Sequence, residues 1–508
     1  MESTSGIPRG NVSVGPRSLI LITVDCLRAD RVGFLGHPGA TTPFLDSLAA
    51  ESIVFKNAIA SGVPTYYSLP ALLASRYPLA LGRDVIGIGP GESTIATELK
   101  ECGFKTAAFV AGNPYISSAG GYSDGFDVFR NFLSSDQIGF DSVVESVSFL
   151  SLRGRANRML SRVCHSVPVL GAAYDELYFQ YCQQLSQNKG ESLDGSRRFP
   201  SADVIVDCAT AWLNQNSVGP FFLWLHLMDP HAPYYPKAEA LQEMGNSVSA
   251  AEVRRLNSFW ARQDISSGRL QKKCSSIQSL YDAGIRWADE QIGQLAQRLA
   301  ELNLWQRCAI AITADHGEEF LEHGGRFHSP LNLHEELIHV PLLVRVPGIV
   351  ECREIDQPFG LIDLAPTLFA ALDIPAPASF RGRSCWGNLG THEGWDWPVL
   401  TECAYGCTNP FHAGKRLAPR LLAVRKGEYK LVINFLSGTD QLFELSSDPG
   451  EAHPLPWGTA SNVRKHLLEC AKKHVAESHK SRDLEIRLAA QTRELRTKWT
   501  QTAASRPN

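Results

Sequence analysis

Continuous apolar runs alternate along this chain with segments in which apolar residues recur every three or four positions. A continuous run rich in Val, Ile and Leu is typical of a strand buried on both faces, whereas the recurring spacing is typical of a helix with one buried side. The continuous runs predict strands within residues 18–25, 105–112, 220–230, 308–317 and 341–348. The spaced segments predict helices within residues 41–55, 67–74, 94–104, 202–214, 279–303 and 361–372.

The order of these elements predicts an α/β fold. Strands that alternate with helices form mainly parallel sheets covered by helices on both faces. Near Pro398 the pattern changes to short strands around turns, which predicts a small antiparallel sheet. We expect a disordered N-terminal tail at 1–16, a catalytic domain at 17–397 with an insertion or lid at 132–199, a small-sheet subdomain at 398–460, and a charged helix with a tail at 461–508.

The bulk composition narrows the range of partners. The chain has 508 residues and a formal net charge of −4, which gives no reason to expect nucleic acid or an anionic membrane. Its first residues lack the charged and then apolar pattern of a secretory signal, and no apolar run is long enough to cross a bilayer. We therefore expect a cytoplasmic protein without a membrane span, while its oligomeric state stays open.

The clearest candidate for chemistry is the segment TADHGEEFLEHGGRFH, residues 313–328. A predicted strand delivers Asp315 and His316 at its carboxyl end, and Asp25 ends the first strand in the same way. Ligands of open parallel sheets bind beyond these strand ends. Carboxylates and an imidazole suit one divalent metal ion, with Ca²⁺, Mn²⁺ and Zn²⁺ as candidates. In the structural alternative, Asp315 caps the following helix and His316 packs.

A hydroxyl near the start of a predicted helix is the candidate nucleophile. Thr65 precedes the helix expected from Tyr67, and a helix N-terminus favours negative charge on an oxygen placed there. A metal that coordinates this oxygen would lower its pKa and make it a nucleophile. Alternatively, Thr65 is only a helix cap, and Ser61 and Ser68 are competing hydroxyls.

Two further segments carry candidates for binding an anionic group. His231, in HLMDPHAPYYP after another predicted strand, could bind an anionic ester or protonate a leaving group. It could equally be a packed loop histidine. His323 and His328, with Arg326, follow the expected metal pair on a glycine-containing loop, where positive charge could stabilise the transferred group.

With these residues in place, the sequence resembles the sulfatase family. The resemblance runs from residue 17 to residue 455 and rests on ordered segments such as ITVDCLRADRVGFLG, PTYYSLPALLASRYP, HLMDPHAPYYP, TADHGEEFLEHG and LHEELIHVPLLVRVPG. It implies the α/β/α sandwich of the alkaline phosphatase superfamily with a small C-terminal sheet. It also implies roles for single residues: metal binding by Asp25, Asp315 and His316, nucleophilic attack by Thr65, and substrate binding and catalysis by His231 and His328.

The sequence departs from the family pattern in two segments. Many sulfatases carry Cys-x-Pro-x-Arg at the nucleophile and convert the cysteine to formylglycine, whereas residues 65–69 read TYYSL here. Threonine cannot be converted, so no formylglycine is expected, and Leu69 replaces the assisting arginine. Cys26 stands where many relatives have a second metal-binding aspartate, and its thiol either ligates a soft metal or packs.

We therefore expect a metal-dependent hydrolase that cleaves a small anionic sulfate or phosphate ester through a covalent ester on Thr65. The departures leave alternatives open. One is a phosphodiesterase or a phosphoryl-group transferase of the phosphoethanolamine type, although such transferases carry membrane helices that this sequence does not show. Another is a catalytically inactive binding protein that keeps the fold.

Overall fold

β1 (Ser18–Val24) lies inside an eight-stranded sheet in the computed structural model of this protein. It pairs in parallel with β6 (Phe221–Leu227) on one side and with β7 (Cys308–Thr313) on the other. Every residue of β1 is buried, which explains why the strand is apolar without alternation. The structure describes residues 17–78, 87–133, 193, 196–262, 264–328, 332–349, 352–389, 394–404 and 419–478.

The strand order of the sheet is β12–β2–β11–β7–β1–β6–β4–β5. Its other strands are β2 (Ile53–Phe55), β4 (Lys105–Val110), β5 (Val128–Arg130), β11 (Leu342–Arg345) and β12 (Arg353–Ile355). Neighbours from β7 to β5 are parallel, whereas β11 runs antiparallel to β7 and β2. The sheet is therefore mainly parallel. β11 can run antiparallel to β7 because the chain returns from β7 to β11 without a long crossover helix.

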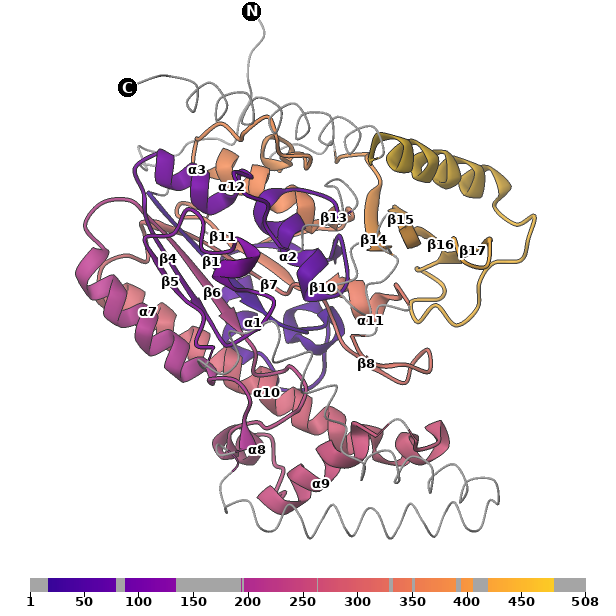
Figure 1. Ribbon diagram of the computed structural model, residues 1–508, viewed down its shortest axis with the longest axis horizontal. Coiled ribbons are helices and arrows are strands. Elements are labelled where there is room, and N and C mark those ends of the chain that lie inside the picture. Colours follow the sequence, from indigo (N-terminus) through magenta and orange to yellow (C-terminus); the bar gives the residue numbers. More distant parts are fainter. Residues whose placement is uncertain are drawn as a thin grey trace, which may run out of the picture.

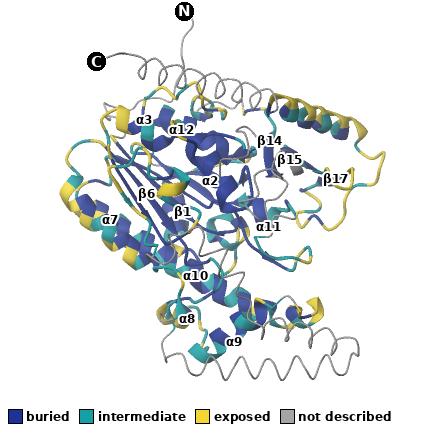
Figure 2. Cartoon of the chain, viewed as in Figure 1, coloured by how far each residue is buried: buried dark blue, intermediate teal, exposed yellow. Residues whose placement is uncertain are grey.

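Helices cover both faces of this sheet (Figure 1). One face carries α1 (Pro43–Ala49), α7 (Ala202–Asn216) and α10 (Ser267–Glu301), and the other carries α2 (Thr65–Ala74), α3 (Ile95–Glu101) and α12 (Leu364–Ala371). Their buried sides and the sheet form one large apolar core, shown in dark blue in Figure 2. The expected α/β/α sandwich is confirmed.

A smaller antiparallel sheet lies beside the sandwich (Figure 1). Its order is β14–β15–β16–β17, formed by Val399–Ala404, Pro419–Lys426, Tyr429–Asn434 and Thr439–Glu444. The expected small C-terminal sheet is therefore confirmed. The helix over residues 461–478 packs on one face of this sheet. The domain boundaries stay predictions, and the tail at 1–16, most of the insertion at 132–199 and the chain after residue 478 lie outside the described residues.

Short elements complete the edge of the sandwich. β8 (Glu319–Phe320) and β9 (Arg326–Phe327) form a hairpin after β7. β3 (Ala58–Ile59) pairs with both β10 (His339–Val340) and β13 (Phe359–Gly360). The remaining short helices are α8 (Ala238–Glu243), α9 (Ala250–Trp260) and α11 (Glu335–Ile338).

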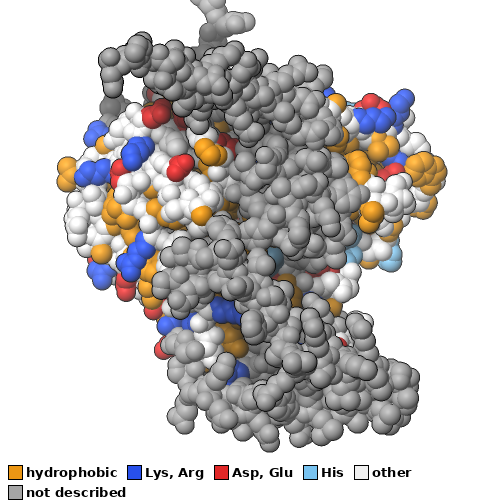
Figure 3. Space-filling model, viewed as in Figure 1, with side chains coloured by type: hydrophobic (Ala, Val, Ile, Leu, Met, Phe, Trp, Pro, Cys, Tyr) orange, Lys and Arg blue, Asp and Glu red, His pale blue; other side chains and the backbone are white. Residues whose placement is uncertain are grey.

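The described surface is mixed in charge. Acidic and basic side chains are interspersed over the described part of the face in Figure 3, in agreement with the small net charge. Within the described ranges, no helix has both the length and the apolar character that crossing a bilayer requires.

Candidate functional site

Side chains from four neighbouring strands meet at the carboxyl edge of the large sheet. Asp25 follows β1, Asp315 and His316 follow β7, Asn113 follows β4, and His226 lies on β6. One ligand atom from each of Asp25, Asp315 and His316 lies within 4.8 Å of the others, and all three side chains are fully buried. The structure thus brings together the residues that the sequence predicts as metal ligands.

Polar neighbours hold Asp25 in its ionised form. Its Oδ2 accepts a hydrogen bond of 3.0 Å from Asn113 Nδ2 and lies 3.2 Å from His226 Nε2. Burial raises the pKa of Asp25, but the charge of His231 and the hydrogen bond and charge of His226 outweigh it and hold the pKa well below its usual range. Asp25 therefore presents a negative charge to the cluster.

Asp315 has a buried carboxylate oxygen that makes no hydrogen bond. Its Oδ1 accepts the backbone N–H of His316 at 3.0 Å, whereas its Oδ2 is unpaired and lies 3.5 Å from His316 Nε2. An unpaired charged oxygen is costly to bury, and a cation at this point would offset that cost. The carboxylates of Asp25 and Asp315 and the imidazole of His316 are donors that divalent metals accept. These residues therefore fit the expected metal.

The hydroxyl of Thr65 reaches the same cluster. Thr65 Oγ1 lies 3.0 Å from His316 Nε2. His316 Nδ1 lies 2.8 Å from the carbonyl oxygen of Gly317, which can only accept, so Nδ1 carries the proton of the neutral ring and Nε2 carries a lone pair. The Thr65 hydroxyl therefore donates toward His316 Nε2, and its oxygen faces the cluster.

The competing hydroxyls have other partners. Ser68 Oγ donates to the carbonyl oxygen of Thr65 at 3.4 Å, and Ser61 Oγ accepts the backbone N–H of Ile362 at 3.2 Å. Of these three hydroxyls, that of Thr65 is the one that lies within hydrogen-bond distance of His316. Thr65 was expected just before the helix, but it forms the first residue of α2 because Pro64 takes the cap position.

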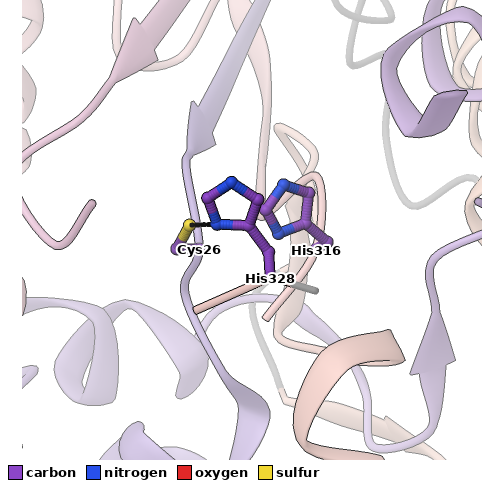
Figure 4. A group of neighbouring side chains, drawn as sticks. All are labelled: Cys26, His316 and His328. Carbon is purple, nitrogen blue, oxygen red and sulfur yellow. Dashed lines mark hydrogen bonds between the residues drawn. The ribbon is translucent and has the colours of Figure 1, made fainter. Parts of the chain in front are cut away.

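His328 lies beside the cluster and pairs with an acidic side chain. It projects toward His316 and Cys26 (Figure 4), and its ring centroid is 4.9 Å from that of His316. Its Nδ1 lies 3.2 Å from Glu318 Oε2. Burial lowers the pKa of His328, but the hydrogen bond and charge of Glu318 outweigh burial, so the pKa is raised.

His231 lies next to His328. The two ring centroids are 5.0 Å apart. Burial lowers the pKa of His231, and its Nδ1 lies 2.5 Å from the carbonyl oxygen of Ala232, so Nδ1 donates to that oxygen. The sequence placed both histidines at the site without distinguishing them, and their surroundings shift their pKa values in opposite directions.

Arg326 is not brought into the cluster. The β8–β9 hairpin turns its side chain toward α9, where the guanidinium donates to the carbonyl oxygen of Trp260 and packs over the Trp260 ring. Its expected role in substrate binding stays a prediction that this conformation does not support. His323 is also directed elsewhere, because its Nδ1 lies 2.6 Å from Glu336 Oε1 and its Nε2 lies 3.3 Å from the carbonyl oxygen of Glu451.

The surroundings of His323 predict a pH-dependent stability. Both ring nitrogens face acceptors, and the Glu336 hydrogen bond raises the pKa of His323 to about 8. A histidine whose pKa is higher in the folded state than in the unfolded state stabilises the fold while it is protonated. This stabilisation is complete below the unfolded-state pKa of about 6.5 and is lost as the pH rises through about 8. We expect His323→Gln to lower the melting temperature at about pH 6 and to change it little at about pH 9. Equal losses at both pH values in thermal unfolding would contradict this assignment.

Gly317 permits a close approach behind the metal pair. A Cβ at this position would lie 2.0 Å from the carbonyl oxygen of Glu336 in α11. Gly317→Ala must push the two segments apart, so we expect it to lower the free energy of unfolding by about 1–3 kcal/mol. Urea unfolding measures this, with Gly268→Ala on α10 as the control, because a Cβ there meets nothing within 4 Å. Similar changes in both variants would speak against the close approach.

Three residues of the site were missed by the sequence reasoning: Asn113, His226 and Glu318. Asn113 follows a predicted strand just as Asp25 does, and this signal could have identified it. His226 interrupts an apolar strand, and a polar residue in a buried strand requires a partner. The sequence holds no signal that separates Glu318 from its neighbour Glu319.

Comparison with known sequences identifies related proteins. The sulfatase family model matches residues 17–374, and the model of the C-terminal part of N-sulphoglucosamine sulphohydrolase matches residues 322–477. Arylsulfatase K of Rattus norvegicus is 27% identical over 273 residues, and the match spans 48% of this chain and about half (47%) of that protein's length. The multifunctional alkaline phosphatase superfamily protein PehA of Trinickia caryophylli is 23% identical over 86% of this chain and 90% of its own.

Solved structures share the fold. The phosphonate monoester hydrolase of Agrobacterium radiobacter superimposes with a TM-score of 0.62 at 18% identity, over 92% of this chain and 96% of its own. A protein solved with its substrate D-glucosamine-2-N,6-O-disulfate superimposes with a TM-score of 0.66 at 16% identity, over 92% and 98% of the two chains. Since the family model covers the whole span from the first strand to residue 374, this chain belongs to the sulfatase family.

Proposed function

We propose that this chain is a metal-dependent hydrolase that transfers the anionic group of a small ester first to Thr65 and then to water. The position of Thr65 carries the proposal. Its buried Oγ1 lies 3.0 Å from His316 Nε2, and the same nitrogen lies 3.8 Å from Asp25 Oδ1 and 3.5 Å from Asp315 Oδ2. A hydroxyl beside such activating groups is typical of a covalent nucleophile, and the similarity to arylsulfatase K and to PehA supports this class of reaction.

Asp25, Asp315 and His316 would hold the metal, which when bound supplies positive charge that lowers the pKa of a nearby hydroxyl and stabilises anionic oxygens. Other residues of the chain prepare the site. Asn113 and His226 fix the orientation of the Asp25 carboxylate. Thr65 lies at the N-terminus of the ten-residue helix α2, whose partial positive charge also favours an anionic group.

The reaction then has two displacements. Thr65 Oγ1 loses its proton to solvent and forms a bond to the phosphorus or sulfur while the bond to the leaving oxygen breaks. The leaving oxygen takes up a proton from His328, which Glu318 holds by its side-chain contact. Water then attacks the same phosphorus or sulfur and gives one proton to His328. The bond to Thr65 Oγ1 breaks, and this oxygen takes up a proton from solvent as the anion is released.

The threonine narrows the class of ester. The hydrate of formylglycine can expel sulfate with its second hydroxyl, whereas threonine carries one oxygen on Cβ. Release from Thr65 therefore requires attack of water on the transferred group, and such in-line displacement suits phosphorus. We accordingly propose phosphate or phosphonate esters as the preferred substrates.

A panel of aryl esters with one common leaving group tests this proposal. The panel contains a sulfate, a phosphate monoester, a phosphate diester and a phosphonate monoester, and kcat/KM is measured before and after chelation of metal. We expect the phosphorus esters to be cleaved faster than the sulfate and chelation to stop all turnover. Faster cleavage of the sulfate would overturn the substrate class. Absence of turnover by metal-loaded protein on every ester would favour the inactive binding protein.

A further inference from the structure

The Cys26 thiol lies within the cluster, although the proposed mechanism does not use it. The side chain is fully buried. Its Sγ lies 3.1 Å from Asp25 Oδ1 and 3.6 Å from His328 Nδ1, and Figure 4 shows it facing the two imidazoles. The backbone N–H of the same residue points to Asp315 Oδ1 at 3.4 Å. Cys26 therefore contacts the expected metal site through both its side chain and its main chain.

The backbone directs Cys26 toward the same point as Asp25. Consecutive residues of a strand point to opposite faces of the sheet. Cys26 breaks this alternation, because it follows β1 with a φ of 63°, in the left-handed region that residues with a Cβ rarely adopt. Unfavourable backbone conformations of this kind gather at functional sites.

The surroundings of Cys26 differ from those of packed thiols. The buried side chains of Cys274, Cys308 and Cys385 belong to the large apolar core. Cys26 belongs to none of the apolar clusters formed by the described residues. Its neighbours are carboxylates and imidazoles that could hold a metal ion. Simple packing therefore does not account for a thiol at this position.

We propose that Cys26 is a thiolate ligand of the metal and makes the site selective for Zn²⁺ over Ca²⁺. This inference rests on the proposed function, which places a metal here. Asp25 Oδ1 lies 3.1 Å from Cys26 Sγ and 3.8 Å from His316 Nε2, and His316 Nε2 lies 3.5 Å from Asp315 Oδ2. Ligands that bind Zn²⁺ tetrahedrally at about 2.0–2.3 Å are separated by roughly 3.3–3.8 Å. The three distances given above are within this range or slightly below it, and one ligand atom of Cys26 lies within 4.8 Å of ligand atoms of His316 and His328.

The donor types decide between the two metals. Ca²⁺ prefers about six to eight oxygen ligands, whereas sulfur and nitrogen supply two of the four donors named above. Thiolate and imidazole favour Zn²⁺, and on binding the thiol proton of Cys26 passes to solvent. The unpaired, fully buried Asp315 Oδ2 is an independent sign that a cation is accommodated at this point.

Loading the metal-free full-length protein with Co²⁺ tests the thiolate directly, because a cobalt–thiolate bond gives a charge-transfer absorption that oxygen and nitrogen ligands do not. We expect this band in the wild type and in the control Cys102→Ser, which alters an exposed thiol, and we expect its loss in Cys26→Ser. Competition with a chelator should show Zn²⁺ binding weakened at least about 10–100-fold in Cys26→Ser, the usual cost of losing even an outer-shell partner. Cys26→Asp should shift preference toward Ca²⁺.

The outcomes separate this inference from the proposed function. If the wild type binds one equivalent of Co²⁺ without the charge-transfer band, ligation by Cys26 is overturned, whereas the proposal of a metal-dependent hydrolase still holds. Failure of Co²⁺ to bind, or equal binding to Asp315→Ala, would overturn both. The wild-type spectrum needs no variant, so the test stands even if Cys26→Ser does not fold.

Discussion

Thr65→Val is expected to lower kcat by roughly 10³-fold or more on every ester that the protein cleaves. Valine keeps the branched shape of threonine and removes the hydroxyl, so α2 should still begin at this residue. Thr65 Oγ1 is the oxygen that faces His316 within the buried cluster, and without it the covalent ester cannot form. Steady-state kinetics on the best ester of the panel measures the loss.

Two matched variants serve as controls for the loss of activity in Thr65→Val. Ser68→Ala should keep nearly full activity, because the Ser68 hydroxyl donates to a backbone carbonyl. Thr65→Ser should keep part of the activity, since it retains an oxygen on Cβ. If Ser68→Ala abolishes turnover and Thr65→Val does not, the nucleophile has been assigned to the wrong residue.

Lys430→Met is expected to lower the free energy of unfolding by about 3–5 kcal/mol. Lys430 lies on β16 and is fully buried, and its Nζ is 2.9 Å from Glu335 Oε1 and 2.9 Å from Glu451 Oε1. Burial lowers the pKa of Lys430, but these carboxylates outweigh it and raise the pKa. Removal of the ammonium takes away the cation that bridges the two carboxylates. The fully buried Glu451 is left with His334 Nδ1 at 3.2 Å, while Glu335 keeps Arg425 at 2.8 Å.

Urea unfolding at neutral pH measures the effect of Lys430→Met, and Lys472→Met is the control. Lys472 pairs with Glu469 on an exposed helix surface, where a single pair contributes about 0–1 kcal/mol. We also expect Lys430→Met to reduce activity, because Glu335 begins α11, the helix that packs against Gly317 behind the metal pair. Equal, small changes in the two variants would show that the buried network does not stabilise this junction.

Much of the fold follows from local patterns. The apolar runs that form β1, β6 and β7 are buried on both faces, so their sequences predict central positions in the sheet. The direction of β11 could not be predicted, because it depends on how the chain returns from β7. α10 begins at Ser267, earlier than expected, although Leu270, Cys274 and Ile277 continue its buried side.

The convergence of the expected metal ligands could be predicted because strand ends gather at one edge of a parallel sheet. This rule alone predicts that Asp25, Asp315 and His316 lie close together. Asn113 and His226 also depended on strand order, since β6 must lie next to β1, and β4 next to β6, before these side chains reach Asp25. The displacement of Arg326 depended on the direction of a hairpin, which local sequence does not specify.

Thr65 is expected to carry the substrate's anionic group during turnover. Rapid acid quenching of the metal-loaded protein with its best aryl ester, followed by peptide mass spectrometry, tests this most directly. We predict a phosphoryl or sulfuryl group on the peptide that contains Thr65, present during turnover and absent from Thr65→Val. An adduct on Ser68 or another side chain, or no adduct while product accumulates in a burst, would contradict the account.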